Sequence, residues 1–96
     1  MKVEVSLQVA EFVRSQPPEG RRQLRQALRA LGLGKGDIKA LEGPLEGYCR
    51  LRVGGYRVVF SYAGRRTIQC IFAERRSIIY EVFAQVLNAK LAGLEK

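Results

Sequence analysis

Arginine residues are concentrated in one third of this chain, and their chemistry is the first clue to function. Between Tyr48 and Ser77 the basic residues are all arginine, namely Arg50, Arg52, Arg57, Arg65, Arg66, Arg75 and Arg76. The only acid there is Glu74, so seven positive charges against one negative charge supply +6 of the net +8. Guanidinium groups pair with phosphate in a bidentate manner and stack on bases. The segment predicts a surface that binds nucleic acid, or an acidic protein that covers it.

A predicted hairpin positions three of these arginines. Two β-branched and aromatic runs flank Gly54-Gly55, and such a glycine pair favours a two-residue turn because glycine adopts a positive φ without steric cost. One face then carries the pairs Val53–Tyr56, Leu51–Val58 and Cys49–Phe60, and the other carries Arg52–Arg57, Arg50–Val59 and Tyr48–Ser61. The first face suits a core. Opposed arginines on the second face repel one another, so we expect an anion to meet them.

Such a surface has part of the chemistry that RNA cleavage needs. The reaction requires an aligned 2′-hydroxyl, stabilisation of the phosphorane charge, and proton transfer. Arginines stabilise the charge, and Tyr80 and Tyr48 offer faces on which a base stacks. Glu74 is the only nearby carboxylate, and both a catalytic role and a plain surface ion pair remain open for it. The chain has no histidine, and its two cysteines lack metal-site spacing, so we expect no metal and no cofactor.

The remaining elements predict a single α+β domain over residues 1–96. We expect the order β-α-α-β-β-β-α: a strand at residues 2–5, helices at 7–15 and about 18–31, a loop from Gly34 to Gly47, strands at 48–53, 56–62 and 67–73, and a helix after Ser77. The last strand lacks clean alternation, which predicts a central strand covered on both faces, with a possible bulge. Leu41 and Leu45 of the loop are expected to fill the core.

Other features narrow the class of protein. The second helix carries Arg21, Arg22, Arg25 and Arg29, which we interpret as a solvated face, the alternative being a supplementary contact to nucleic acid or a partner. There is no apolar run of membrane-spanning length, and the charged N-terminus is unlike a signal peptide. Cys49 and Cys70 are expected to be buried free thiols. These features predict a cytoplasmic protein with no membrane partner.

Two segments resemble the signatures of the RelE/ParE toxin superfamily. Residues 41–58, LEGPLEGYCRLRVGGYRV, are similar to its central pattern of a leucine-and-glycine loop, a Tyr-x-Arg-Leu-Arg strand, a glycine turn and Tyr-Arg-Val. Residues 74–80, ERRSIIY, resemble a second pattern in which arginines precede a tyrosine. The resemblance implies two helices packed on a small twisted antiparallel sheet, followed by a C-terminal helix. RelE-type members are toxins of type II toxin–antitoxin systems that cut messenger RNA in the ribosomal A site.

The resemblance also assigns roles to residues. By position it implies catalytic roles for Arg50, Arg57, Tyr80 and one of Arg75 and Arg76, with Arg76 preferred, and Glu74 joins them on chemical grounds. We expect RNA contacts from Tyr48, Arg52, Arg65, Arg66 and Arg75. This chain has Tyr48 where the RelE pattern has a lysine, so the identity of the general base stays open.

The resemblance leaves three functions to compare. The leading hypothesis is a ribosome-dependent, metal-independent endoribonuclease, an mRNA interferase that inhibits translation during stress. The alternatives are a ParE-like inhibitor of DNA gyrase without nuclease activity, and a catalytically weakened relative that binds RNA or antitoxin. For all three, the expected protein partner is a cognate antitoxin with an acidic or amphipathic segment.

Overall fold

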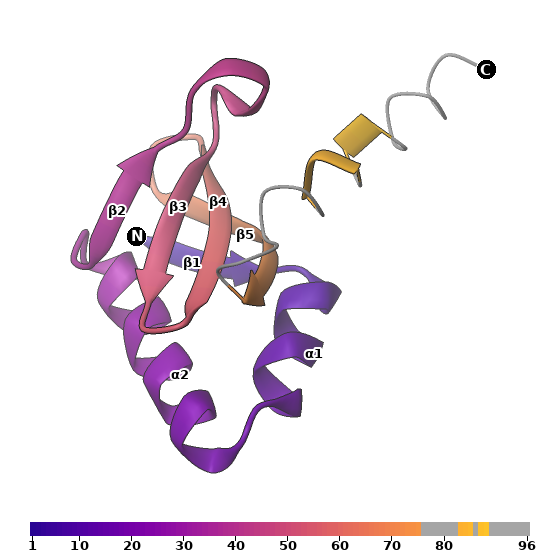
Figure 1. The fold of residues 1–96 in the computed structure, drawn as a ribbon. Coiled ribbons are helices and arrows are strands. Elements are labelled where there is room, and N and C mark those ends of the chain that lie inside the picture. Colours follow the sequence, from indigo (N-terminus) through magenta and orange to yellow (C-terminus); the bar gives the residue numbers. More distant parts are fainter. Residues whose placement is uncertain (76–82, 86, 89–96) are drawn as a thin grey trace.

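The computed structural model describes residues 1–75, 83–85 and 87–88 of the chain. Its elements are β1 (Lys2–Val5), α1 (Leu7–Ser15), α2 (Pro18–Gly32), β2 (Asp37–Ala40), the 3-10 turn η1 (Gly43–Leu45), β3 (Cys49–Val53), β4 (Tyr56–Ala63) and β5 (Thr67–Arg75). Residues 83–85 and 87–88 are helical, and the rest of the expected C-terminal helix lies outside the described residues. The two helices form a V that is joined beside Pro18 and lies against the sheet (Figure 1).

Local signals in the sequence set the helix boundaries as predicted. The hydroxyl of Ser6 accepts a hydrogen bond from the backbone N–H of Val9 at 3.2 Å, which caps α1. Pro18 occupies the first turn of α2, where its missing N–H costs nothing. Gly34 follows α2 with a φ of +75°, a conformation that glycine adopts readily.

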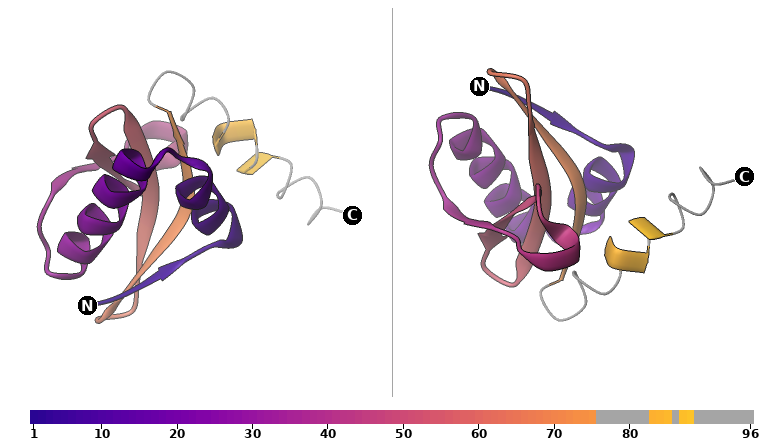
Figure 2. Two further views of the ribbon diagram at one scale, coloured as in Figure 1. Left: turned by 90° about the horizontal axis from the view of Figure 1, so that it is seen from below. Right: turned by 90° about the horizontal axis from the view of Figure 1, so that it is seen from above.

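The sheet has five strands in the order β1-β5-β4-β3-β2. Strands β2, β3, β4 and β5 pair with one another antiparallel, whereas β1 pairs with β5 in parallel. The expectation of an antiparallel sheet is therefore correct for all but β1. Parallel pairing needs a long connection between the two strands, and everything from α1 to β4 provides it here. Figure 2 shows the strong twist of the long strands β4 and β5.

The prediction of an irregular loop from Gly34 to Gly47 was wrong at its centre. Residues Asp37–Ala40 form β2, an edge strand that pairs with β3. Its four residues contain one large apolar side chain, Ile38, so their alternation is too short to mark a strand in the sequence. Pairing with β3 forms this strand, and a tertiary contact of that kind is invisible to local propensity.

The hairpin of β3 and β4 has the predicted register. Val53 pairs with Tyr56, Leu51 with Val58 and Cys49 with Phe60, and on the opposite face Arg52 pairs with Arg57. Gly54 has a φ of +56°, as the first residue of a two-residue hairpin turn requires. The prediction for β5 is also confirmed, because this strand is central and its pairing with β4 shifts between Val59 and Phe60.

Two hydrophobic clusters cover the two faces of the sheet. On the face toward α1 and α2, hereafter the helix face, the buried residues are Val9, Val13, Leu24, Leu31, Leu51, Val58, Phe60, Ile68, Cys70 and Ala73. On the other face a smaller cluster joins Val59, Phe72 and Phe83. Leu41 and Leu45 pack against this second cluster, so they fill a core, but not the one under the helices.

Candidate nucleic-acid interface

Four charged residues lie in one row across the sheet, on the face opposite the helices. The strand registers pair Asp37 with Arg52, Arg52 with Arg57, and Arg57 with Glu74. Side chains that are directly opposite have Cβ atoms about 5 Å apart and share a face. We call this surface, with the neighbouring row Lys39–Arg50–Val59–Phe72, the arginine face. Two central arginines therefore have one acid on each side.

Arg50 and Arg52 share a single carboxylate. The Nε of Arg52 lies 2.8 Å from Oδ2 of Asp37, and Nη1 of Arg50 lies 3.3 Å from Oδ1. The Arg50 side chain is 15% exposed, against 56% for Arg52. Arg50 is thus held and largely shielded, while Arg52 presents its guanidinium to solvent. Part of the repulsion expected between the arginines is offset by Asp37, within the protein itself.

Arg57 is oriented by the hairpin turn. Its Nη1 donates to the carbonyl oxygens of Gly54 and Tyr56, each at 2.8 Å. These bonds tie the guanidinium to the turn, and in the strand register Arg57 stands between Arg52 and Glu74. Oε1 of Glu74 in turn accepts a hydrogen bond from the backbone N–H of Arg75 at 3.0 Å. Both bonds of Arg57 to the turn are made by one of its two terminal nitrogens.

Tyr56 connects the helices to the strand that carries Arg57. Its ring packs edge-to-face on Phe12, with 5.7 Å between ring centroids. Its hydroxyl occupies the space that a Cβ at Gly20 would need, so α2 can approach the hairpin only with glycine there. The position of Arg57 therefore depends on packing across the whole helix face.

Tyr48, which we expect to offer a face for base stacking, packs against the second hydrophobic cluster. It is half-buried immediately before β3, and its ring packs edge-to-face on Phe83 with 5.1 Å between centroids. A cavity of about 530 Å³ lies beside it, lined by Ser6, Leu7, Gln8, Tyr48, Ile71, Phe72, Phe83 and Leu87. Gln8 and Ser6 are bonded to the backbone of Ala73 and Ile71 respectively, so the wall is largely apolar.

The structure separates the remaining predicted site residues. Arg75 pairs with Tyr56, which belongs to the helix face, so Arg75 does not share the row of Arg57 and Glu74. Arg65 and Arg66 form the β4–β5 turn, at the far end of β4 from Arg57. At about 3.3 Å per residue that separation exceeds roughly 20 Å. Arg76 and Tyr80 lie outside the described residues, so their predicted roles stay predictions.

Two residues of the arginine face were missed from the sequence. Asp37 and Lys39 lie on β2, and Lys39 pairs with Arg50. The sequence between Lys39 and Lys90 contains no lysine, but β2 places one directly beside the first arginine of β3. The alternation of Asp37 and Lys39 with Ile38 and Ala40 is the only local signal, and it is too short to indicate a strand unaided.

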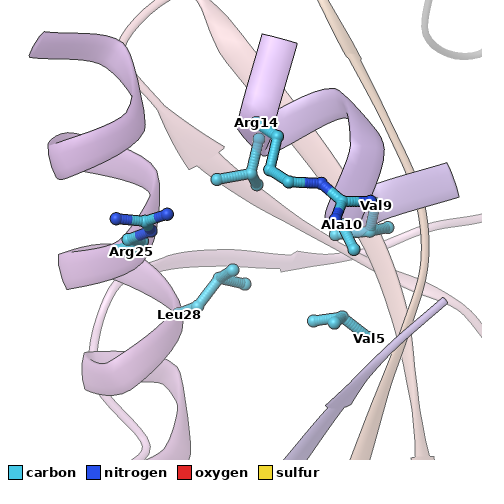
Figure 3. A pocket seen from close by; sticks show the side chains of 7 residues that line it. Val5, Val9, Ala10, Arg14, Arg25 and Leu28 are labelled. Atoms are coloured by element: carbon cyan, nitrogen blue, oxygen red, sulfur yellow. The ribbon is translucent and has the colours of Figure 1, made fainter. Parts of the chain in front are cut away.

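A second recess lies on the helix side of the molecule. It has a volume of about 250 Å³, and its lining residues are Val5, Val9, Ala10, Val13, Arg14, Arg25 and Leu28. Figure 3 shows Arg14 of α1 and Arg25 of α2 beside the apolar side chains of Val5 and Leu28. Arg21, Arg22 and Arg29 continue the basic surface along α2, where Arg22 pairs with Glu19.

The described residues were also compared with the requirements of a metal site and of a reactive thiol. No group of three or more His, Cys, Asp or Glu side chains among them is arranged to hold a metal ion. Cys49 and Cys70 are free thiols, half-buried and buried respectively. Burial raises the pKa of both, and raises that of Cys70 to about 11, so these thiols stay protonated at neutral pH. No helix in the described part of the chain is long and apolar enough to cross a membrane.

Comparison with solved structures shows that toxins and toxin–antitoxin complexes share this fold. The chain superposes on one chain of the RelB–RelE antitoxin–toxin complex from Methanococcus jannaschii with a TM-score of 0.65 and 24% identity. The match covers 82% of this chain and 96% of the Methanococcus jannaschii chain. For the toxin–antitoxin complex RelBE2 from Mycobacterium tuberculosis the TM-score is 0.64 at 19% identity, covering 78% and 96%. For the YoeB/ParE toxin from Agrobacterium tumefaciens it is 0.54 at 22%, covering 79% and 99%.

These neighbours establish that the chain has the fold of RelE/ParE-type toxins, as the resemblance of its signatures implied. The structural likeness extends over 78–82% of this chain and over 96–99% of each of the three neighbours. No protein-family model and no curated protein sequence matches the chain.

Proposed function

We propose that this protein is the toxin of a type II toxin–antitoxin system and cleaves messenger RNA in the ribosomal A site without a metal ion. The observation that carries the proposal is the convergence of Arg50, Arg52 and Arg57 on one face of a RelE-like sheet. Three guanidinium groups form a surface suited to the phosphates of one RNA strand.

The proposed reaction is an in-line attack within the RNA strand. The 2′-oxygen bonds to the adjacent phosphorus and the bond from phosphorus to the 5′-oxygen breaks, which leaves a 2′,3′-cyclic phosphate and a 5′-hydroxyl end. The proton of the 2′-hydroxyl is removed, and the departing 5′-oxygen gains one. Arg57 and Arg52 stabilise the negative charge of the phosphorane as it develops.

Proton transfer is the step for which this site is least equipped. Arginine is a poor general base at neutral pH because its pKa exceeds about 12. Glu74, in register with Arg57, is the carboxylate best placed to accept the proton from the 2′-hydroxyl. A site of this kind gains most from a substrate that is already held in line, and dependence on the ribosome supplies that alignment.

The proposed partner is a cognate antitoxin that acts in the cytoplasm with the toxin. Its acidic residues would meet the arginine face and so block access of RNA. The helix-side recess, apolar at its floor and bordered by Arg14 and Arg25, fits an amphipathic antitoxin segment. Co-expression with the adjacent reading frame should give a complex that weakens as salt concentration rises.

Mapping the 5′ ends of ribosome-bound transcripts after induction tests the proposed activity. We expect codon-phased breaks with the wild-type chain and none with Arg57→Ala. Intact messages together with trapped gyrase–DNA complexes would contradict the proposal and favour a ParE-like inhibitor. Intact messages without gyrase complexes would favour a relative that only binds RNA or antitoxin.

A further inference from the structure

The edge strand β2 contributes an acid to the centre of a basic surface. Asp37 contacts Arg52 through Oδ2 at 2.8 Å and Arg50 through Oδ1 at 3.3 Å. Its backbone carbonyl also accepts a hydrogen bond from Nη1 of Arg50, again at 3.3 Å. One residue therefore holds two arginines that are two positions apart on β3.

The strand register explains why both arginines reach the same carboxylate. Asp37 is paired with Arg52, and Arg50 belongs to the next pair on the same face, with Lys39 as its partner. Arginine and lysine side chains have many rotamers, and like charges in adjacent pairs repel. Without a fixed anion between them, Arg50 and Arg52 would separate into different orientations.

The geometry of the contacts favours a role in which Asp37 orients the two arginines over one in which it competes with a phosphate for them. Asp37 engages Nε of Arg52 and a single terminal nitrogen of Arg50. A guanidinium has five N–H donors, so each arginine keeps most of its donors for a phosphate. Arg52 also remains 56% exposed while it is bound to Asp37. The carboxylate fixes both side chains and leaves Arg52 open to RNA, whereas Arg50 is held with 15% of its side chain exposed.

We propose that Asp37 is a positioning residue for RNA cleavage. It acts through Arg50 and Arg52, aligning their guanidinium groups with the scissile phosphate, and does not itself touch the substrate. This inference rests on the proposed endoribonuclease function. A positioning role differs from a purely electrostatic effect of the Asp37 charge. If Asp37 positions the arginines, removal of its negative charge should strengthen RNA binding and yet slow the reaction.

The test compares Asp37→Asn with Glu46→Gln. Both substitutions remove one negative charge, but Glu46 is an exposed residue of the loop that follows η1, and within the described residues the ion pairs of Arg50 and Arg52 do not include it. Binding is measured by fluorescence anisotropy with a single-stranded 2′-O-methyl RNA, which cannot be cleaved. The rate is measured in a single turnover on programmed ribosomes.

We expect Asp37→Asn to bind the RNA as tightly as Glu46→Gln, or more tightly, and to cleave roughly tenfold more slowly, since small misplacements of catalytic groups cost this much or more. Asp37→Glu, which keeps the charge, should recover part of the rate. A rise in both affinity and rate would overturn the proposal in favour of a competing anion. Parallel losses of binding, rate and melting temperature would overturn it in favour of a structural role.

A second measurement separates this proposal from the proposed function. In ¹⁵N NMR spectra the hydrogen-bonded Nε–Hε group of Arg52 should give a resolved signal that Asp37→Asn shifts or broadens and Glu46→Gln leaves in place. If wild-type protein leaves ribosome-bound RNA intact, the proposed function fails, and this spectrum still decides whether Asp37 orders the arginine. An unchanged signal in Asp37→Asn would refute the positioning role whatever the cleavage assay shows.

Discussion

The two faces of one sheet perform different tasks with alternate residues of the same strands. Along β3, Leu51 is buried under the helices while Arg50 and Arg52 lie on the opposite side. Along β4, Val58 and Phe60 are buried on the helix face, and Arg57 lies beside Glu74 on the other. The period of two thus separates residues that stabilise the fold from residues available for chemistry.

The two faces of the sheet differ most in their electrostatics. The helix face excludes enough water that burial raises the pKa of Cys70 from 9.0 to about 11. The arginine face places charges in a row with an acid at each end, which limits the repulsion between its arginines. Its second cluster, Val59, Phe72 and Phe83, gives this face an apolar part beside the charged part. Both faces stabilise the protein, and Arg50, Arg52 and Arg57 of the central hairpin all lie on the arginine face.

The largest expected effect comes from the helix face. Phe60 is fully buried, so Phe60→Ala should lower the free energy of unfolding by about 3–5 kcal/mol through lost contacts and a cavity. Arg52→Ala, on the exposed face of the neighbouring strand, should change it by less than about 0.5 kcal/mol. Urea denaturation followed by circular dichroism measures both. Similar losses of unfolding free energy in the two variants would contradict the expected difference between the helix face and the arginine face.

The next effect belongs to Arg57 and appears in rate rather than stability. Arg57→Ala should slow cleavage on the ribosome by about 100-fold, the usual cost of one donor that stabilises an anionic transition state. Arg57→Lys keeps the charge without the planar fork and should recover only part of that rate. Single-turnover assays measure the rates, and the melting temperatures of the variants are compared with that of the wild-type protein. A rate within twofold of wild type in Arg57→Ala would exclude Arg57 from the chemistry.

A smaller effect is expected from Lys39, the residue that β2 adds to the arginine face. Lys39→Gln should weaken binding of single-stranded RNA a few-fold and reduce the slope of log K against log salt by about 0.7, the value for one phosphate contact. Lys35→Gln, in the exposed segment before β2, is the charge-matched control. Equal slopes for the two variants would place Lys39 outside the RNA contact.

The smallest effect concerns the thiol under the helices. The pKa of Cys70 is raised by burial from 9.0 to about 11 in the folded chain, so the folded state binds its proton more tightly than the unfolded state does. The resulting stability is fully present below pH 9.0, and it is lost as the pH rises toward about 11. A thiol reagent at pH 8 should react with Cys70 only after denaturation. Rapid reaction in the native protein would show that the helix face is open to water.

Much of this comparison was predictable from the sequence, and the gaps have physical causes. The hairpin register follows from alternation and the glycine turn, and so does the gathering of Arg50, Arg52 and Arg57. The strand β2 was missed because only its pairing with β3 stabilises it, and Asp37 was missed with it. Arg65 and Arg66, expected to contact RNA, lie in the turn after β4, and the sequence did not show how far the length of this strand separates them from Arg57.

The proposed function is cleavage of messenger RNA on the ribosome by the arginine face. The most direct test programmes purified ribosomes with a short messenger RNA, adds the protein, and maps the 5′ ends by primer extension. We expect a cut within the A-site codon that requires the ribosome and forms about 100-fold more slowly with Arg57→Ala. Uncut RNA at full occupancy of the A-site complex, alongside inhibition of gyrase supercoiling by the same preparation, would contradict it.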